Sequence, residues 1–206
     1  LRWVLAGGNA QILENFYQLL AGMVREGKDL NLIIKALDQK MPKNEELEPK
    51  FQAEAPSSSY VKLVLARIEQ EISKDEKQYD AKKVHLEFIA PPPPTKGFQA
   101  WLAHMYPGEV EKMELEYATT VSQWGNITLV DKAVPLVARG GTFAEKSQGS
   151  ADYEGYAIST YGITRNLAEL EDWDRFKIKD RNTWIGECVM SIWPADGQAE
   201  DIKPFN

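Results

Sequence analysis

Residues 84–91 (VHLEFIAP) alternate apolar and polar side chains from Val84 to Phe88 and end in proline, and this stretch decides the fold class. Such alternation is typical of a β-strand. Since successive side chains of a strand point to opposite faces, Leu86 and Phe88 share one face while His85 and Glu87 share the other. A strand inside an otherwise helical sequence predicts a mixed α+β fold.

The prolines at residues 91–94 end this strand, because proline cannot donate to a β-ladder. They favour a stiff polyproline II segment, which is either a rigid loop or a ligand for a module that binds such helices. A second strand is predicted at residues 126–130 (NITLV), directly after Gly125. Residues 133–138 are a candidate partner for it, although Pro135 counts against their pairing.

Helical periodicity dominates the chain before this region. The charged residues 74–83 separate the two parts, so we expect a helical linker or docking subdomain at residues 1–83 and a second domain at residues 84–206. Residues 41–56, which contain prolines and many charges, are expected to form a loop. The predicted helices of the first part are residues 9–23, 29–40 and a long helix from residue 57.

Short helices are predicted around the second strand. Their apolar spacing, with an N-cap residue before several of them, indicates helices that wrap a small core. The expected fold is therefore α+β and mostly helical. The predicted helices are residues 98–106, 109–124, 142–146, 164–171 and a last one from residue 174 to Pro194.

Composition restricts the chemistry. The 206 residues contain 24 Lys+Arg and 31 Asp+Glu, a formal charge of −7, which argues against nonspecific polyanion binding by bulk charge. The single cysteine, Cys188, excludes an intrachain disulfide and a cysteine-rich zinc site. No membrane-spanning run or signal peptide is evident, so a cytoplasmic setting is expected. Because the first residue is Leu1, we expect the chain to be part of a longer one.

His85 and Glu87 are the first candidates for chemistry. Side by side on one strand face, they could share a metal ion or a proton. A solvent-facing edge strand explains them equally well. His104 and Cys188 are interpreted as structural, and residues 140–147 as a turn into a helix N-terminus, since this stretch lacks the glycine that precedes the lysine of a phosphate-binding loop.

Several segments occur in an order and spacing that resemble a known family. They are residues 125–130 (GNITLV), 143–146 (FAEK), 156–159 (YAIS), 164–167 (TRNL) and a closing helix with Trp173, Ile178 and Arg181. Together they resemble the C-terminal HNH-like domain of GmrSD-type restriction endonucleases, a group that includes SspE-like defence nucleases. The resemblance begins near Tyr60. It implies a strand–strand–helix (ββα-metal) core and a role in anti-phage restriction.

The departures from this family concern its catalytic positions. Residues 86–91 align with the Glu-His-Ile-x-Pro strand of the family, but Phe88 occupies the position of the catalytic histidine. Pro135 and Gly140 occupy the positions of two asparagines. An HNH site uses its histidine as general base beside one divalent ion, and none of these three residues can take either role. His85 lies three positions earlier, so strand alternation places it on the opposite face.

The resemblance therefore implies a nuclease fold that is degenerate in catalysis and acts in DNA binding or assembly. No metal is assigned. The expected partners of this domain are DNA, including modified phage DNA, and either the N-terminal domain of a longer protein or a partner subunit. The candidate DNA contacts are Lys132, Arg139, Lys146, Arg165 and Arg181, although an internal salt bridge within the packing of the closing helix is favoured for Arg181.

Two alternatives remain open. One is an active metal-dependent endonuclease or nickase that uses His85, with Glu87 and Asn126, and requires Mg²⁺ or Mn²⁺. A β-bulge or a one-residue slip of the strand would be needed to turn His85 to the required face. The other alternative is a helical protein with a small mixed domain that is unrelated to nucleases.

Overall fold

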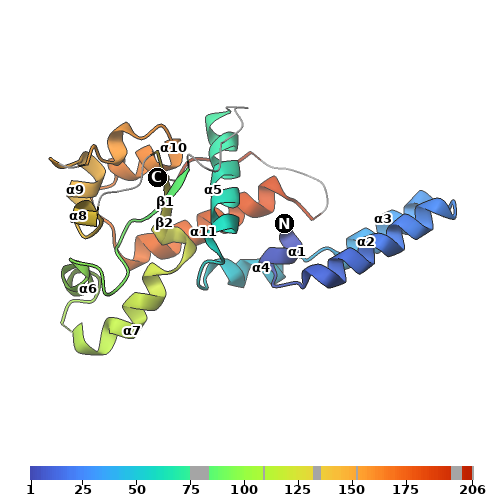
Figure 1. Cartoon of the computed structure of the whole chain (residues 1–206), viewed down its shortest axis with the longest axis horizontal. Coiled ribbons are helices and arrows are strands. Elements are labelled where there is room, and N and C mark those ends of the chain that lie inside the picture. Colours follow the sequence, from blue (N-terminus) through green and yellow to red (C-terminus); the bar gives the residue numbers. More distant parts are fainter. Residues whose placement is uncertain (75–83, 109, 132–135, 152, 196–200, 206) are drawn as a thin grey trace.

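The computed structural model describes residues 1–74, 84–108, 110–131, 136–151, 153–195 and 201–205. The described chain is mostly helical around one small two-stranded sheet (Figure 1), as the sequence predicted. A long C-terminal helix, α11 (Arg175–Ile192), runs through the body, and a helical hairpin projects from it. Within the described residues, no helix has the length and apolar character needed to cross a membrane.

The sheet pairs β1 (His85–Phe88) with β2 (Ile127–Val130) in antiparallel register, with Glu87 opposite Thr128 and His85 opposite Val130. Both strands were predicted. The proposed pairing of β2 with residues 133–138 is wrong for residues 136–138, because they belong to the helix α8 (Leu136–Arg139), and β2 pairs with β1. Residues 132–135 lie outside the described part of the chain.

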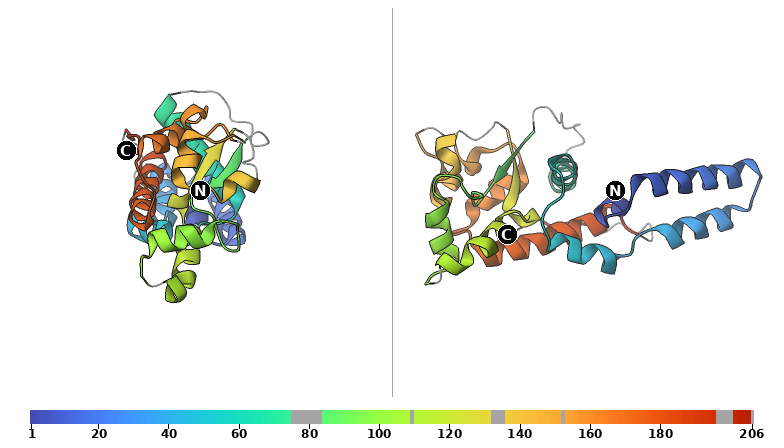
Figure 2. Two further views of the ribbon diagram at one scale, coloured as in Figure 1. Left: turned by 90° about the vertical axis from the view of Figure 1, so that its left-hand side faces the viewer. Right: turned by 60° about the horizontal axis from the view of Figure 1, so that its bottom comes forward.

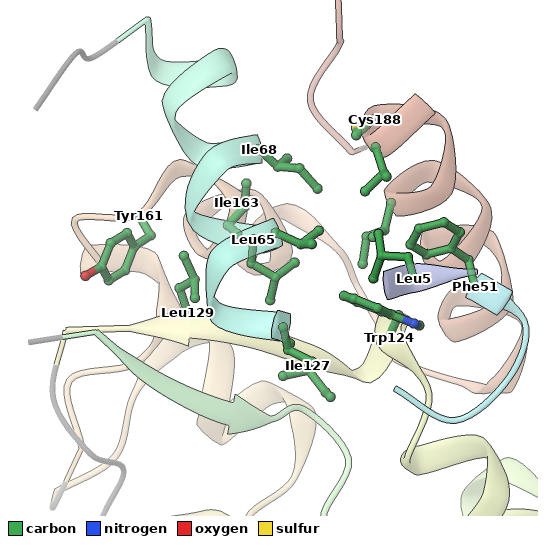
Figure 3. Close-up of a cluster of buried hydrophobic side chains, with 14 of the residues drawn as sticks. Leu5, Phe51, Leu65, Ile68, Trp124, Ile127, Leu129, Tyr161, Ile163 and Cys188 are labelled. Carbon is green, nitrogen blue, oxygen red and sulfur yellow. The ribbon is translucent and has the colours of Figure 1, made fainter. Parts of the chain in front are cut away.

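One face of the sheet packs against α5 (Ser58–Ser73). Ile127 and Leu129 on β2 lie beneath Leu65 and Ile68 of α5 (Figure 3), and all four are buried. The long helix predicted from residue 57 is thus the one that covers the sheet. The opposite face of the sheet carries Glu87 and Thr128, because residues that lie directly opposite in an antiparallel pair point to the same side.

The predicted loop at residues 41–56 is wrong, because it contains the helix α4 (Asn44–Phe51) with Pro49 inside it. Leu47 and Phe51, spaced i and i+4, are both buried and anchor the helix on the core. The centre of the Phe51 ring lies 5.2 Å from that of the Trp124 ring. On the α11 side, Phe51 packs closely against Gly186, where an added Cβ atom would come within 3.1 Å of the Phe51 ring.

This cluster contains residues from both sides of the division expected at residues 83/84. It joins α4 and α5 to β2 and α11 in one apolar core (Figure 3). Cys188 belongs to it as a buried thiol, as predicted, and burial raises the pKa of that thiol to about 12. A second cluster lies around Trp101, Tyr117 and Trp173. It collects buried side chains from α6 (Phe98–Met105), α7 (Val110–Val121), α9 (Phe143–Gln148) and α11.

Short helical turns cover the polar face of the sheet. The helix predicted at residues 164–171 begins earlier than expected, as α10 (Gly162–Arg165), and continues as the 3₁₀ turn η3 (Asn166–Glu169). The earlier start is stabilised by the buried Glu69 of α5, whose carboxylate accepts hydrogen bonds from the Gly162 and Ile163 amides at 2.9 and 2.8 Å. The 3₁₀ turn η2 (Tyr156–Ile158) belongs to this layer, whereas η1 (Trp124–Asn126) leads into β2 and packs against α11.

The hairpin consists of α2 (Ala10–Arg25) and α3 (Leu30–Lys40), which follow the short α1 (Arg2–Leu5). Both helices start where the sequence predicted, since the side chains of Asn9 and Asp29 accept hydrogen bonds from the first-turn amides of Gln11 and Asn31. The right-hand view of Figure 2 shows, as Figure 1 does, that this pair extends away from the body.

Candidate functional site

A buried ion pair lies on the polar face of the sheet. Lys146 of α9 donates from Nζ to Glu87 Oε1 at 2.7 Å and to the Phe88 carbonyl at 2.8 Å. The two residues are only 1% and 5% exposed. Thr142 caps α9 in a capping box with Glu145, which fixes the helix so that Lys146 points at the strand. The pair therefore links α9 to the end of β1.

The pair is held in a poorly solvated position. Burial raises the pKa of Glu87, and the adjacent Lys146 opposes that shift. Burial likewise lowers the pKa of Lys146, and Glu87 opposes this shift. Arg139 of α8 is exposed and lies close enough to influence both groups. Each charge of the pair thus depends on its partner, because neither is solvated by bulk water.

Asn126 closes the turn that follows β1. Its side chain is fully buried, accepts from the Ala90 amide at 2.8 Å and from the Trp173 indole at 3.2 Å, and donates to the Ala90 and Val121 carbonyls, both at 2.8 Å. These four bonds use both amide protons and the carbonyl oxygen. Asn126 therefore connects β1, α7 and the start of α11, and its side-chain polar groups are already engaged.

Arg181 and two threonines fill the space beneath β2. Arg181 is fully buried and donates to the carbonyls of Gly125 and Ile127 at 2.7 and 2.8 Å, and the hydroxyls of Thr128 and Thr164 lie 2.8 Å apart. Burial lowers the pKa of Arg181 to about 10, so the guanidinium remains charged at neutral pH. Arg181 is internal, as favoured, but the hydrogen-bond partners that the structure describes are backbone carbonyls and the Thr128 hydroxyl, and not the carboxylate of a salt bridge.

His85, Glu87 and Asn126 are not brought together as a catalytic group. His85 lies at one end of the ribbon opposite Val130, whereas the Asn126 carbonyl accepts from the Ile89 amide just beyond the other end. At about 3.3 Å per residue, these two ends are roughly 13 Å apart. Glu87 lies between them and is bonded to Lys146.

The donor set of this strand does not fit a divalent ion. The Glu87 carboxylate is engaged by Lys146, and His85 and Asn126 lie at opposite ends of the two-stranded ribbon. In the part of the chain that the structure describes, no group of three or more His, Cys, Asp or Glu side chains is placed to hold a metal ion. Phe88, which the resemblance in the sequence aligns with a catalytic histidine, is 37% exposed.

The five candidate DNA contacts differ in accessibility. Lys132 lies outside the described residues. Lys146 and Arg181 are buried, whereas Arg139 and Arg165 are exposed. The Arg165 guanidinium donates to the carbonyls of Ser159 and Thr160 at 2.6 and 2.7 Å, which fixes its orientation at the surface.

Asp131, at the end of β2, holds the same loop in place. It accepts hydrogen bonds from the Thr160 amide at 2.9 Å and from the Ser159 hydroxyl at 3.1 Å, and it also bonds the Thr160 hydroxyl. Partial burial raises the pKa of Asp131, but these hydrogen bonds outweigh that effect and its pKa lies below the ordinary value. The position of Arg165 is therefore connected to the sheet through this loop.

The structure adds a histidine–carboxylate pair that the sequence analysis missed. His104 Nε2 lies 3.0 Å from Asp172 Oδ1, and both residues line a cavity of about 320 Å³ with Trp101 and Phe143. The sequence offered no local signal for this pair, because its members are 68 residues apart and neither belongs to a recognised motif.

Comparison with known proteins gives one family. The model of the C-terminal domain of GmrSD restriction endonucleases matches residues 39–188. Neither the curated proteins nor the solved structures gave a significant match.

Proposed function

Since the chain belongs to the family of GmrSD restriction endonuclease C-terminal domains, we propose that it is a DNA-contacting module of a restriction-type defence protein and does not itself cut DNA. The HNH-like strand–strand–helix unit of this proposal is β1, β2 and α9. Its partners are DNA, which includes modified phage DNA, and either an N-terminal domain of a longer chain or a separate subunit.

The observation that carries the proposal is the buried bond between Lys146 and Glu87. In a metal-dependent nuclease, the residues of this strand would have to present oxygen or nitrogen atoms to an ion and a water molecule. Here the one carboxylate of the strand is neutralised by an ammonium at 2.7 Å. The side chain beside it is Phe88, which can neither accept a proton nor bind a metal. These features favour a structural role for the strand.

DNA binding is assigned to the exposed cations that surround this strand. Arg139 ends α8 directly before the Gly140–Gly141 turn into α9, and Arg165 ends α10. Guanidinium groups on a fixed backbone suit phosphate contacts, which orient a protein on DNA without reading its sequence. Because the chain carries a net charge of −7 and two phosphate contacts are assigned, we expect modest affinity, with a slope of log K against log salt of about −2.

We predict that Arg139→Glu and Arg165→Glu each weaken DNA binding about tenfold and lower the slope of log K against log salt by about one unit. The reason is the loss of one phosphate contact in each variant. The measurement is a fluorescence anisotropy titration of a labelled duplex at several salt concentrations.

The matched control for these variants is Lys179→Glu, which makes the same charge change at an exposed position of α11. Binding should be unaffected by this change. Equal losses in all three variants would mean that only bulk charge matters. Full binding by both arginine variants would contradict the assignment of these contacts.

A further inference from the structure

The projecting hairpin exposes large apolar side chains on both of its helices. Seven of them are between 45% and 67% exposed, whereas Leu20 on α2 and Ile33 on α3 are buried. Water-exposed apolar side chains in contiguous rows usually mark an interaction surface. The seven are Ile12, Tyr17, Leu19, Val24, Leu30, Leu32 and Ile34.

Four of these side chains form one continuous flank. On α2, Tyr17 and Val24 are spaced i and i+7, and on α3, Leu30 and Ile34 are spaced i and i+4, so each pair lies in one row. At about 100° per residue, each row is turned in the same rotational sense from the buried residue of its helix, Leu20 or Ile33. Because both helices are right-handed and run antiparallel, the two rows lie on the same side of the hairpin. This apolar flank runs from the tip of the hairpin, at Val24 and Leu30, towards its base.

The charges of the hairpin are balanced. Residues 10–40 contain four acidic and four basic residues, while the whole chain carries −7. The body of the protein therefore repels a second copy, but the hairpin does not. Near the base of the hairpin lie Glu14 and Asp38, and the last turn of α2 at the tip carries Arg25.

From these features we propose that the hairpin is a self-association surface, which pairs antiparallel with the hairpin of a second copy to form a four-helix bundle. In this arrangement the tip of each hairpin meets the base of the other, so that Arg25 of one copy lies near Glu14 and Asp38 of the next. Tyr17, Val24, Leu30 and Ile34 form the apolar centre, with a charged rim around it, as is common in stable interfaces. A twofold axis between the two copies brings the same apolar flank of each copy into contact with the other.

The hairpin can serve this purpose without disturbing the body. α2 and α3 pack on each other, and both figures show the pair extending away from the remaining helices (Figures 1 and 2). The surface is thus separate from the sheet and from the DNA contacts proposed above. Dimerisation would place two such DNA-contacting modules in one particle.

The experiment is sedimentation velocity of the full chain from about 1 to about 100 µM, which covers dissociation constants in the micromolar range. We expect a concentration-dependent dimer. Val24→Glu and Leu30→Glu, both near the tip, should each weaken the dimer at least about 100-fold, because each substitution places one carboxylate from each copy in the apolar centre. The matched control is Leu115→Glu on α7, where the native side chain is 80% exposed, and it should dimerise like the original chain.

A charge exchange tests the antiparallel arrangement. Arg25→Glu should weaken the dimer about tenfold, and the added change Glu14→Arg should restore it, since the two positions meet across the interface. Circular dichroism would verify that each variant is folded. A chain that stays monomeric at about 100 µM, or dimers that survive Val24→Glu and Leu30→Glu, would overturn the proposal.

Discussion

Replacing Lys146 with methionine is expected to destabilise the fold by about 3–5 kcal/mol, the cost typical of breaking a buried ion pair on one side. Methionine preserves most of the length of the side chain but removes the ammonium that bonds Glu87 and the Phe88 carbonyl. The carboxylate would then have to stay charged without a partner or take up a proton. Denaturant unfolding, followed by tryptophan fluorescence, measures the loss.

The double variant Lys146→Met with Glu87→Gln isolates the pair. With both charges removed, most of the stability should return, because no unpaired charge remains buried. Lys179→Met, at an exposed position of α11, is the control and should change stability by less than about 0.5 kcal/mol. A loss below about 1 kcal/mol in Lys146→Met would contradict a structural role for the pair.

Asn126→Ala is expected to lower the free energy of unfolding by at least about 3 kcal/mol. The substitution leaves the Ala90 amide, the Trp173 indole and two carbonyls without their partner in the interior. Each buried polar group that loses its hydrogen bond costs about 1–3 kcal/mol. The measurement is again the free energy of unfolding.

Asn15→Ala on the exposed face of α2 is the control for this substitution, and it should be neutral or slightly stabilising because alanine favours a helix. If Asn126→Ala folded with unchanged stability, the four hydrogen bonds would not contribute to the fold, which would contradict the structural role of Asn126.

Local patterns allowed much of the fold to be predicted. β1 and β2 were found because their residues alternate or form a short apolar run after glycine, and α2, α3, α9 and α11 because a cap residue precedes each of them. α4 was missed because Pro49 and its charges suggested a loop. The burial of Leu47 and Phe51 against α11 outweighs that signal, and it is a tertiary effect.

The candidate site was harder to predict, because it depends on contacts between distant segments. Glu87 was correctly placed on the polar face of its strand, but its partner Lys146 lies 59 residues away. Lys146 was expected to contact DNA, and its charge alone gave no sign that the helix capped by Thr142 would turn it inward. The pair of His104 and Asp172 and the capping of α10 by Glu69 depend on similarly distant contacts.

The most direct test of the account is a plasmid nicking assay with the full chain, in Mg²⁺ or Mn²⁺, on unmodified and modified supercoiled DNA. A mobility-shift lane from each mixture would report binding. We expect the protein to shift the DNA in the mobility-shift lane while the plasmid remains supercoiled. Nicked circles that disappear in His85→Ala or in His104→Ala would contradict it, since either result would show that a histidine of this chain acts as the base in a working nuclease.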